Sequence, residues 1–189
     1  MTKTRAFFPV LLLAFAGFCG WRSARADSFV PLPQVGGENA ALKIRVIKYE
    51  GSVNGGMLVE INNPTNSPQE FVADGLFFVP AGDPEKAPQR LGAAGPFQEI
   101  QGNKSSPHVQ KVALVPGETK RLAIEVFCID SHRGGPNSST QFSVAKERLP
   151  PKLRQSIRTG NDKILEGSKG DVQAAKSAIQ SNMWSERDK

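Results

Sequence analysis

The fold class of this 189-residue chain is indicated by one stretch, Leu122-Ala123-Ile124-Glu125-Val126-Phe127-Cys128-Ile129. Leu122, Ile124 and Val126 stand at every second position, which is the period of the inward face of a strand. Cys128 falls in this phase, so we expect a buried and unreactive thiol. A nucleophilic thiol or an intermolecular bridge is the alternative, because the other cysteine, Cys19, lies in a segment that we expect to be removed.

The same period extends over the first two thirds of the chain. In two early segments the residues of one phase are all apolar. These residues are Leu42, Ile44 and Val46, which alternate with Lys43 and Arg45, and Met57, Val59 and Ile61, which alternate with Leu58 and Glu60. Further extended runs, each bounded by Gly, Pro, Asn or Asp, cover residues 71–79, 109–115, 119–129 and 141–145. Their length and their content of Val, Ile and Phe are typical of strands.

Two turn sequences predict how these strands are joined. Val53-Asn54-Gly55-Gly56 separates the first two strands, and Asn-Gly favours a tight hairpin because both residues tolerate positive φ. Val115-Pro116-Gly117-Glu118 lies between two later strands and has the residues of a type II turn. Antiparallel strands without interleaved helices predict a mainly β fold, an immunoglobulin-like antiparallel sandwich.

The period changes after Ala145, and Leu149-Pro150-Pro151 interrupts any regular element. From Asp171 to Trp184, apolar residues stand three or four apart, at Val172, Ala175, Ile179 and Met183. This spacing predicts a C-terminal α-helical appendage, with Asp171 as its N-cap. The apolar face either packs on the chain's own sandwich or binds another protein through Ile179, Met183 and Trp184.

The first 26 residues have the pattern of a cleavable export signal. Lys3 and Arg5 precede an apolar run from Phe7 to Phe18, and Ala24-Arg25-Ala26 has the small residues that a signal peptidase accepts. We therefore expect a signal peptide over 1–26, a β-sandwich domain over 27–145 and a helical extension over 146–189. The apolar run is too short to span about 30 Å of hydrocarbon. We expect a periplasmic or secreted protein with no membrane span.

Loss of that signal removes most of the positive charge. The full chain carries a net charge of +6, whereas residues 27–189 hold 20 basic and 18 acidic residues. No segment interleaves basic and aromatic residues, so we expect no nucleic-acid partner. The partner that we expect is another extracytoplasmic protein or an envelope component.

Motifs for chemistry are scarce. His108 and His132 lie far apart, without neighbours at metal-ligand spacing, and we expect neither a metal nor a cofactor. Asp130-Ser131-His132 contains the residue types of a hydrolytic triad, but adjacent residues on an extended chain point to opposite faces. We expect no catalytic residues. Two long segments, residues 81–108 and 131–140, are predicted loops that serve as recognition surfaces or are merely mobile.

Several of these turns together resemble those of small exported bacterial immunoglobulin-like β-sandwich proteins. The resemblance covers residues 40–145 and is carried by Ile61 to Pro68, Val79-Pro80-Ala81-Gly82, Pro116-Gly117 and Phe127-Cys128-Ile129-Asp130. It implies an interaction role and assigns no site. We therefore expect an exported, non-enzymatic binding or structural module that acts through its loops or its C-terminal helix. The alternatives are an accessory subunit of an extracytoplasmic enzyme and a carrier of a small ligand or a metal.

Overall fold

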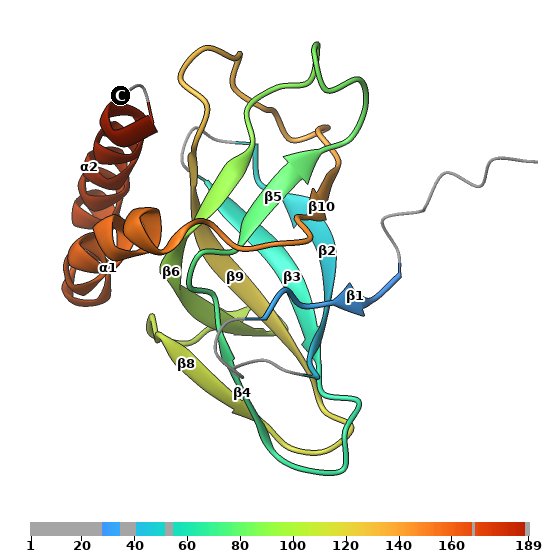
Figure 1. The fold of residues 1–189 in the computed structure, drawn as a ribbon. Coiled ribbons are helices and arrows are strands. Elements are labelled where there is room, and N and C mark those ends of the chain that lie inside the picture. Colours follow the sequence, from blue (N-terminus) through green and yellow to red (C-terminus); the bar gives the residue numbers. More distant parts are fainter. Residues whose placement is uncertain (1–27, 35–40, 52–54, 168, 188–189) are drawn as a thin grey trace, which may run out of the picture.

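The structure is a computed structural model, and it describes residues 28–34, 41–51, 55–167 and 169–187. The predicted signal peptide and Asn54 of the first predicted turn lie outside these residues. The described chain is mainly β, with antiparallel sheets and two C-terminal helices (Figure 1). No helix in the described ranges is both long enough and apolar enough to cross a membrane.

The strands of the described residues form two sheets. Their bounds are β1 Val30–Pro31, β2 Lys43–Tyr49, β3 Gly56–Asn62, β4 Gln69–Val72, β5 Phe77–Pro80, β6 Leu91–Gln101, β7 Lys104–Ser105, β8 Lys111–Leu114, β9 Thr119–Cys128 and β10 Phe142–Val144. The main sheet has eight strands in the order β1-β2-β3-β9-β6-β5-β10, with β7 paired to β6. Strands β4 and β8 form a separate two-stranded sheet.

The main sheet curls into a half-barrel. Strand β10, at one end of the strand order, lies against β2 near the other end. The rings of Tyr49 and Phe142 meet there edge to face, with centroids 5.6 Å apart. The small sheet packs on the interior through Phe71, whose ring lies 5.2 Å from that of Phe97. The immunoglobulin-like form of the expected sandwich is therefore not confirmed.

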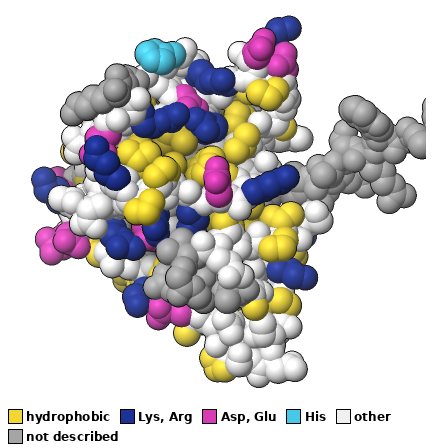
Figure 2. Space-filling view, in the orientation of Figure 1, with side chains coloured by type: hydrophobic (Ala, Val, Ile, Leu, Met, Phe, Trp, Pro, Cys, Tyr) yellow, Lys and Arg dark blue, Asp and Glu magenta, His cyan; other side chains and the backbone are white. Residues whose placement is uncertain are grey.

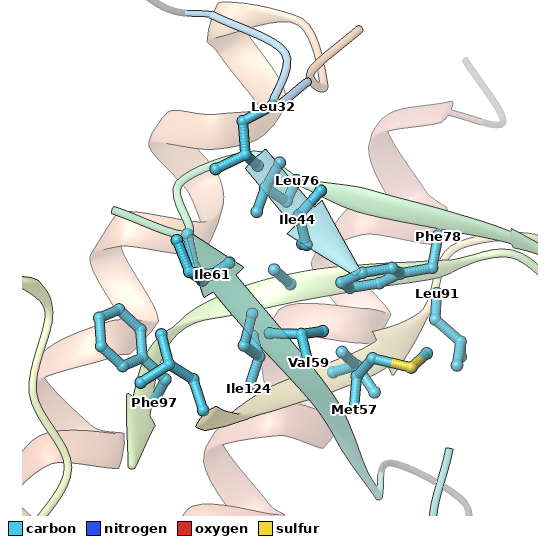
Figure 3. Packing of buried hydrophobic residues seen from close by; sticks show 14 of the residues in the cluster. Leu32, Ile44, Met57, Val59, Ile61, Leu76, Phe78, Leu91, Phe97 and Ile124 are labelled. Carbon is cyan, nitrogen blue, oxygen red and sulfur yellow. The ribbon is translucent and has the colours of Figure 1, made fainter. Parts of the chain in front are cut away.

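The first hydrophobic core fills the inside of this curled sheet (Figure 3). The alternating residues that predicted β2, β3 and β9 point into it, among them Ile44, Met57, Val59 and Ile124, all of them fully buried. Cys128 belongs to the same cluster and is 3% exposed. The period-2 pattern therefore identified the buried face of these strands correctly.

Residues 81–108 are not one long loop, and this expectation was wrong. They contain β6, which pairs with both β5 and β9 in the main sheet. It begins with Leu-Gly-Ala-Ala-Gly-Pro, and these six residues include none of the β-branched residues that identify strands. Small residues are needed because other groups approach closely: a Cβ at Gly95 would lie 2.3 Å from the amide nitrogen of Asn161. The register also shifts between Ala93 and Phe97.

Two further strand predictions need correction. The run 71–79 is divided by a turn at Asp74-Gly75 into the end of β4 and β5, which belong to different sheets. The Pro116-Gly117 turn, in which Gly117 has φ 76°, connects β8 to β9. These two strands are not paired with each other, so the turn carries the chain from the small sheet to the main one.

Two helices follow the strands, α1 (Pro151–Glu166) and α2 (Lys169–Arg187). The sequence did not predict α1, although Pro151 stands at a position where a helix tolerates proline. Gly160 lies inside α1 and allows α2 to approach, since a Cβ there would lie 2.5 Å from Cγ1 of Ile179. Asp171 belongs to the first turn of α2 and is not its N-cap.

A second hydrophobic core lies between these helices and the outer face of the main sheet. Helix α1 packs on β6 and α2 packs on β9. Strand β9 is buried on both faces at its end, because Phe127 belongs to this second core and Cys128 to the first; Ile129, just after the strand, also belongs to the second core. On the face seen in Figure 2, hydrophobic side chains show between basic ones. Val79 and Leu153 are partly buried and pack against the second core.

Candidate functional site

A polar cleft of about 540 Å³ lies where α2 crosses the outer face of the main sheet. Its lining comes from segments far apart in the sequence: Glu50, Gly55, Gly56, Gln98, His108, Ala123, Glu125, Gly167, Val172, Gln173 and Lys176. This volume falls in the range of natural small-ligand pockets. We call it the Lys176 cleft.

Lys176 is the buried charge at the base of this cleft. Its side chain is 0% exposed, because it stands on the face of α2 that also buries Val172 and Ile179. Its Nζ donates to Oε2 of Glu125 at 2.6 Å and to the carbonyl oxygen of Gly55 at 3.2 Å. A lysine without such partners would be strongly destabilising at this position.

Glu125 joins Lys176 to a histidine. It stands on β9 in the phase opposite to Ile124 and therefore faces outward, toward α2. Its Oε1 lies 3.0 Å from Nε2 of His108, which follows β7. Because a carboxylate can only accept, Nε2 carries the hydrogen, and in the neutral ring Nδ1 is left as an acceptor. The Glu125 carboxylate thus holds both the Lys176 ammonium and the His108 ring in position.

The rim of the cleft adds further acceptors. Glu50 is exposed, and its Oε2 accepts a long bond of 3.3 Å from the backbone N–H of Gly56. Gln98 donates its Nε2 to the carbonyl of Ser106 at 2.8 Å, which leaves its Oε1 as an acceptor. In the described part of the chain, no group of three or more His, Cys, Asp or Glu side chains could hold a metal ion.

The three predicted partner-binding residues lie on the inner side of α2. Ile179 and Met183 are 2% and 0% exposed in the second core. Trp184 is partly buried, and its Nε1 donates to the carbonyl oxygen of Cys128 at 3.1 Å. The structure therefore shows the alternative in which the helix packs on the chain's own strands. A partner-binding role for these residues stays a prediction.

An ion cluster anchors the last turn of α2. Asp130 accepts from the guanidinium of Arg90 at 2.7 Å and from Arg187 at 2.9 Å. Burial is the largest single influence and acts to raise the pKa of Asp130, but it is outweighed. Hydrogen bonds from the side chain and the backbone N–H of Arg90, and from Arg187, hold this pKa well below its usual range. The carboxylate is thus committed to these arginines.

Two exposed segments are tied together at one end of the molecule. Nη1 of Arg133 donates to the carbonyl oxygens of Pro84 and Ala87, the latter at 3.2 Å. Gln89 returns a bond from its Nε2 to the carbonyl of Arg133 at 2.7 Å. Residues 81–90 and 131–140 therefore lie side by side (Figure 1). Their role as a recognition surface stays a prediction.

Glu125 and Lys176 were missed by reasoning from the sequence. One signal was available: Lys176 interrupts the apolar stripe of α2, standing four residues after Val172 and three before Ile179. A charge in that position must find a buried partner. Nothing local identifies Glu125 as that partner, because the pairing depends on how the helix crosses the sheet.

No protein-family model, curated protein or solved structure matches the chain.

Proposed function

We propose that the protein is an exported, non-enzymatic binding module and that the Lys176 cleft is its binding site for a small polar ligand. The observation that carries this proposal is the bonded row Lys176–Glu125–His108 along the cleft. An apolar residue of similar size in place of Lys176 would need no partner and is often as stable or more so. A buried charge in this position is better explained by a role in holding Glu125 and His108 for a ligand.

Fixed polar groups are what a ligand site requires. Because Glu125 is held from two sides, His108 presents its ring in one orientation and pays little entropy when a ligand binds. The described lining contains no Ser, Thr or Cys that could act as a nucleophile. Cys128, the thiol of the described chain, is buried in the first core. These features support binding above covalent chemistry.

The binding experiment is a screen of small polar compounds followed by amide NMR. We expect hits to perturb the amides of Gly55, Gly56 and Ala123. Substitution of His108→Gln should abolish these shifts, whereas His132→Gln, in the exposed loop, should leave them unchanged. Hits whose shifts cluster in residues 81–90 and 131–140, and not around the cleft, would contradict the proposal.

Export is the second part of the proposal, and it is supported by the pattern of residues 1–26. The protein recovered from outside the cytoplasm should begin at Asp27, as read by N-terminal sequencing. A protein that retains Met1 would contradict both the compartment and the expected loss of positive charge.

Catalysis is a second candidate function, because a carboxylate bonded to a histidine is also the arrangement of a general base. His108 and Glu125, 3.0 Å apart, would then activate a water molecule in the cleft. In that case Glu125→Gln should lower turnover of a hydrolysed substrate by a factor of about 100 or more. If the parent protein binds the ligand but does not turn it over, this result would favour the non-enzymatic binding module.

Protein recognition is a further candidate, favoured by the contact between the two loops. The resemblance to exported immunoglobulin-like sandwich proteins implies an interaction role, and the bonds from Arg133 would hold such a surface in one shape. Arg133→Ala should then weaken binding of an envelope protein without changing ligand shifts in the cleft. An equal affinity of parent and variant for that protein would remove this candidate.

A further inference from the structure

We propose that the ligand of the Lys176 cleft is an organic cation that carries several N–H donors, a guanidinium or a primary ammonium. This inference rests on the proposed binding function and names the ligand's chemistry. It follows from which polar atoms of the cleft are already bonded and which are left for a ligand.

The positive charge in the cleft is already neutralised. Lys176 has no exposed surface, and its Nζ lies 2.6 Å from Glu125. At that distance the pair presents little net charge to a molecule in the cleft. Lys176 therefore neither binds an incoming anion nor strongly repels a cation.

Three polar side chains of the described lining keep acceptor atoms, whereas Gln173 offers both donors and an acceptor. Glu50 is the lining carboxylate without a cationic partner among the described residues, and it accepts a bond from the backbone N–H of Gly56. His108 has an acceptor at Nδ1 once Nε2 donates to Glu125. Gln98 adds the oxygen of its amide, because its nitrogen donates to Ser106. A ligand that satisfies these atoms must bring donors.

The charge of the cleft favours a cationic ligand, as its hydrogen-bond acceptors do. The Lys176–Glu125 pair is compensated, and the Glu50 carboxylate adds a negative charge at the rim of the cleft. A guanidinium offers five N–H donors in one plane and an ammonium offers three, so either can serve a carboxylate and a neutral acceptor together. A bare divalent ion would need more oxygen ligands than Glu50 alone supplies.

The test is an amide NMR titration of the purified protein with matched probes. N-acetyl-arginine amide and N-acetyl-lysine amide are the cations, and N-acetyl-citrulline amide is a neutral analogue of the first with nearly the same shape. Agmatine serves as a free cation without peptide groups, and its comparison with N-acetyl-arginine amide distinguishes a free organic cation from a peptide side chain. We expect at least one cation to shift the amides of Gly55 and Gly56 and to bind at least tenfold more tightly than the citrulline compound.

Glu50→Gln and Glu70→Gln form the matched pair of variants. Both residues are exposed glutamates, but Glu70 stands on β4 and pairs with Lys111, outside the cleft lining. The expected result is a roughly tenfold loss of affinity for the cation in Glu50→Gln, which corresponds to about 1.4 kcal/mol of binding free energy. Glu70→Gln should leave the affinity unchanged.

Failure of this inference can be told from failure of the binding proposal. Three results would contradict an organic cation as the ligand but keep the cleft as a binding site. They are equal affinity for the citrulline compound, an unchanged affinity of Glu50→Gln for the cation, and cleft shifts with Zn²⁺ but with none of the organic cations. A screen in which compounds of every charge leave the cleft amides unshifted would overturn both.

Discussion

Lys176 carries a charge into the interior and is held there by two acceptors, Glu125 and the carbonyl of Gly55. Its aliphatic stem continues the apolar stripe of α2, so the residue fits a buried position except at its tip. The sequence shows this anomaly, a lysine within an apolar stripe, but it does not show the partners. Glu125 is 51 residues away along the chain, and only the crossing of helix and strand brings the two together.

Cys128 is the residue for which the sequence was most informative. Its phase on β9 predicted burial, and the structure places it in the first core at 3% exposure. Burial is the main influence that raises the pKa of its thiol, and the neighbouring Asp130 acts in the same direction. The reactive thiolate is therefore scarce near neutral pH.

We predict that a maleimide labels Cys128 only after the protein unfolds. Labelling of the native protein should be slower than labelling in denaturant by several orders of magnitude, as measured by intact mass. Stoichiometric labelling of the folded protein within minutes would contradict its burial.

The ion pairs of Asp130 make the free energy of unfolding depend on pH. Its pKa lies below the unfolded value of about 3.9, so its ion pairs stabilise the fold above that pH and the stabilisation is lost as the pH falls further. Asp130→Asn should lower the free energy of unfolding by about 1–3 kcal/mol at pH 7. This difference should shrink below pH 4. Denaturant titrations at both pH values measure it.

The control for Asp130 is Asp162→Asn, on the exposed surface of α1. We expect its effect on unfolding to stay within about 0.5 kcal/mol at either pH. A cost for Asp130→Asn that persists unchanged into strong acid would show that the ion pairs are not its source.

At the scale of elements, β6 and α1 show why some segments could not be predicted. Strand β6 has Gly, Ala and Pro residues near its start, where α1 packs closely on it, and this composition is also that of a loop. Helix α1 contains Gly160 for the same reason. Local propensity describes a segment by itself, whereas these two were selected for how closely another element approaches.

Gly160→Ala tests the contact between the helices. Alanine is favoured over glycine in an isolated helix by about 1 kcal/mol. The added Cβ, however, would lie 2.5 Å from Ile179, and we expect a net loss of about 1–3 kcal/mol. In an Ile179→Ala background this loss should disappear, which a double-mutant cycle of unfolding free energies measures. Stabilisation by Gly160→Ala in the parent would contradict the close contact.

Met183→Ala tests whether α2 is part of the folded core. Met183 is fully buried in the second core, so the substitution should cost about 2–5 kcal/mol. Ser181→Ala, on the exposed face of the same helix, is the control and should change little. Thermal or denaturant unfolding measures both. Equal stability of the two variants would restore the alternative of a helix that is free to bind a partner.

For the whole molecule, the period-2 pattern was sufficient to predict a mainly β chain and the buried faces of β2, β3 and β9. It could not predict that β8 and β9 belong to different sheets, because a Pro-Gly turn reverses the chain in the same way within a sheet or between sheets. It also could not predict the curl that brings β10 against β2. Both depend on contacts between distant segments.

The Lys176 cleft is a property of this whole arrangement. Strand β9 supplies Glu125, the segment after β7 supplies His108, and α2 supplies Lys176. None of these residues forms a motif in the sequence. The site exists because α2 lies across β9 and is held there by the second core and by the bonds of Trp184 and Arg187.

A crystal structure of the protein with N-acetyl-arginine amide tests the central claim most directly. We predict the guanidinium within hydrogen-bonding distance of the Glu50 carboxylate in the Lys176 cleft, with Lys176 still buried against Glu125. A structure in which Lys176 is solvated and apart from Glu125, or in which the compound occupies another surface and leaves the cleft to solvent, would contradict the account.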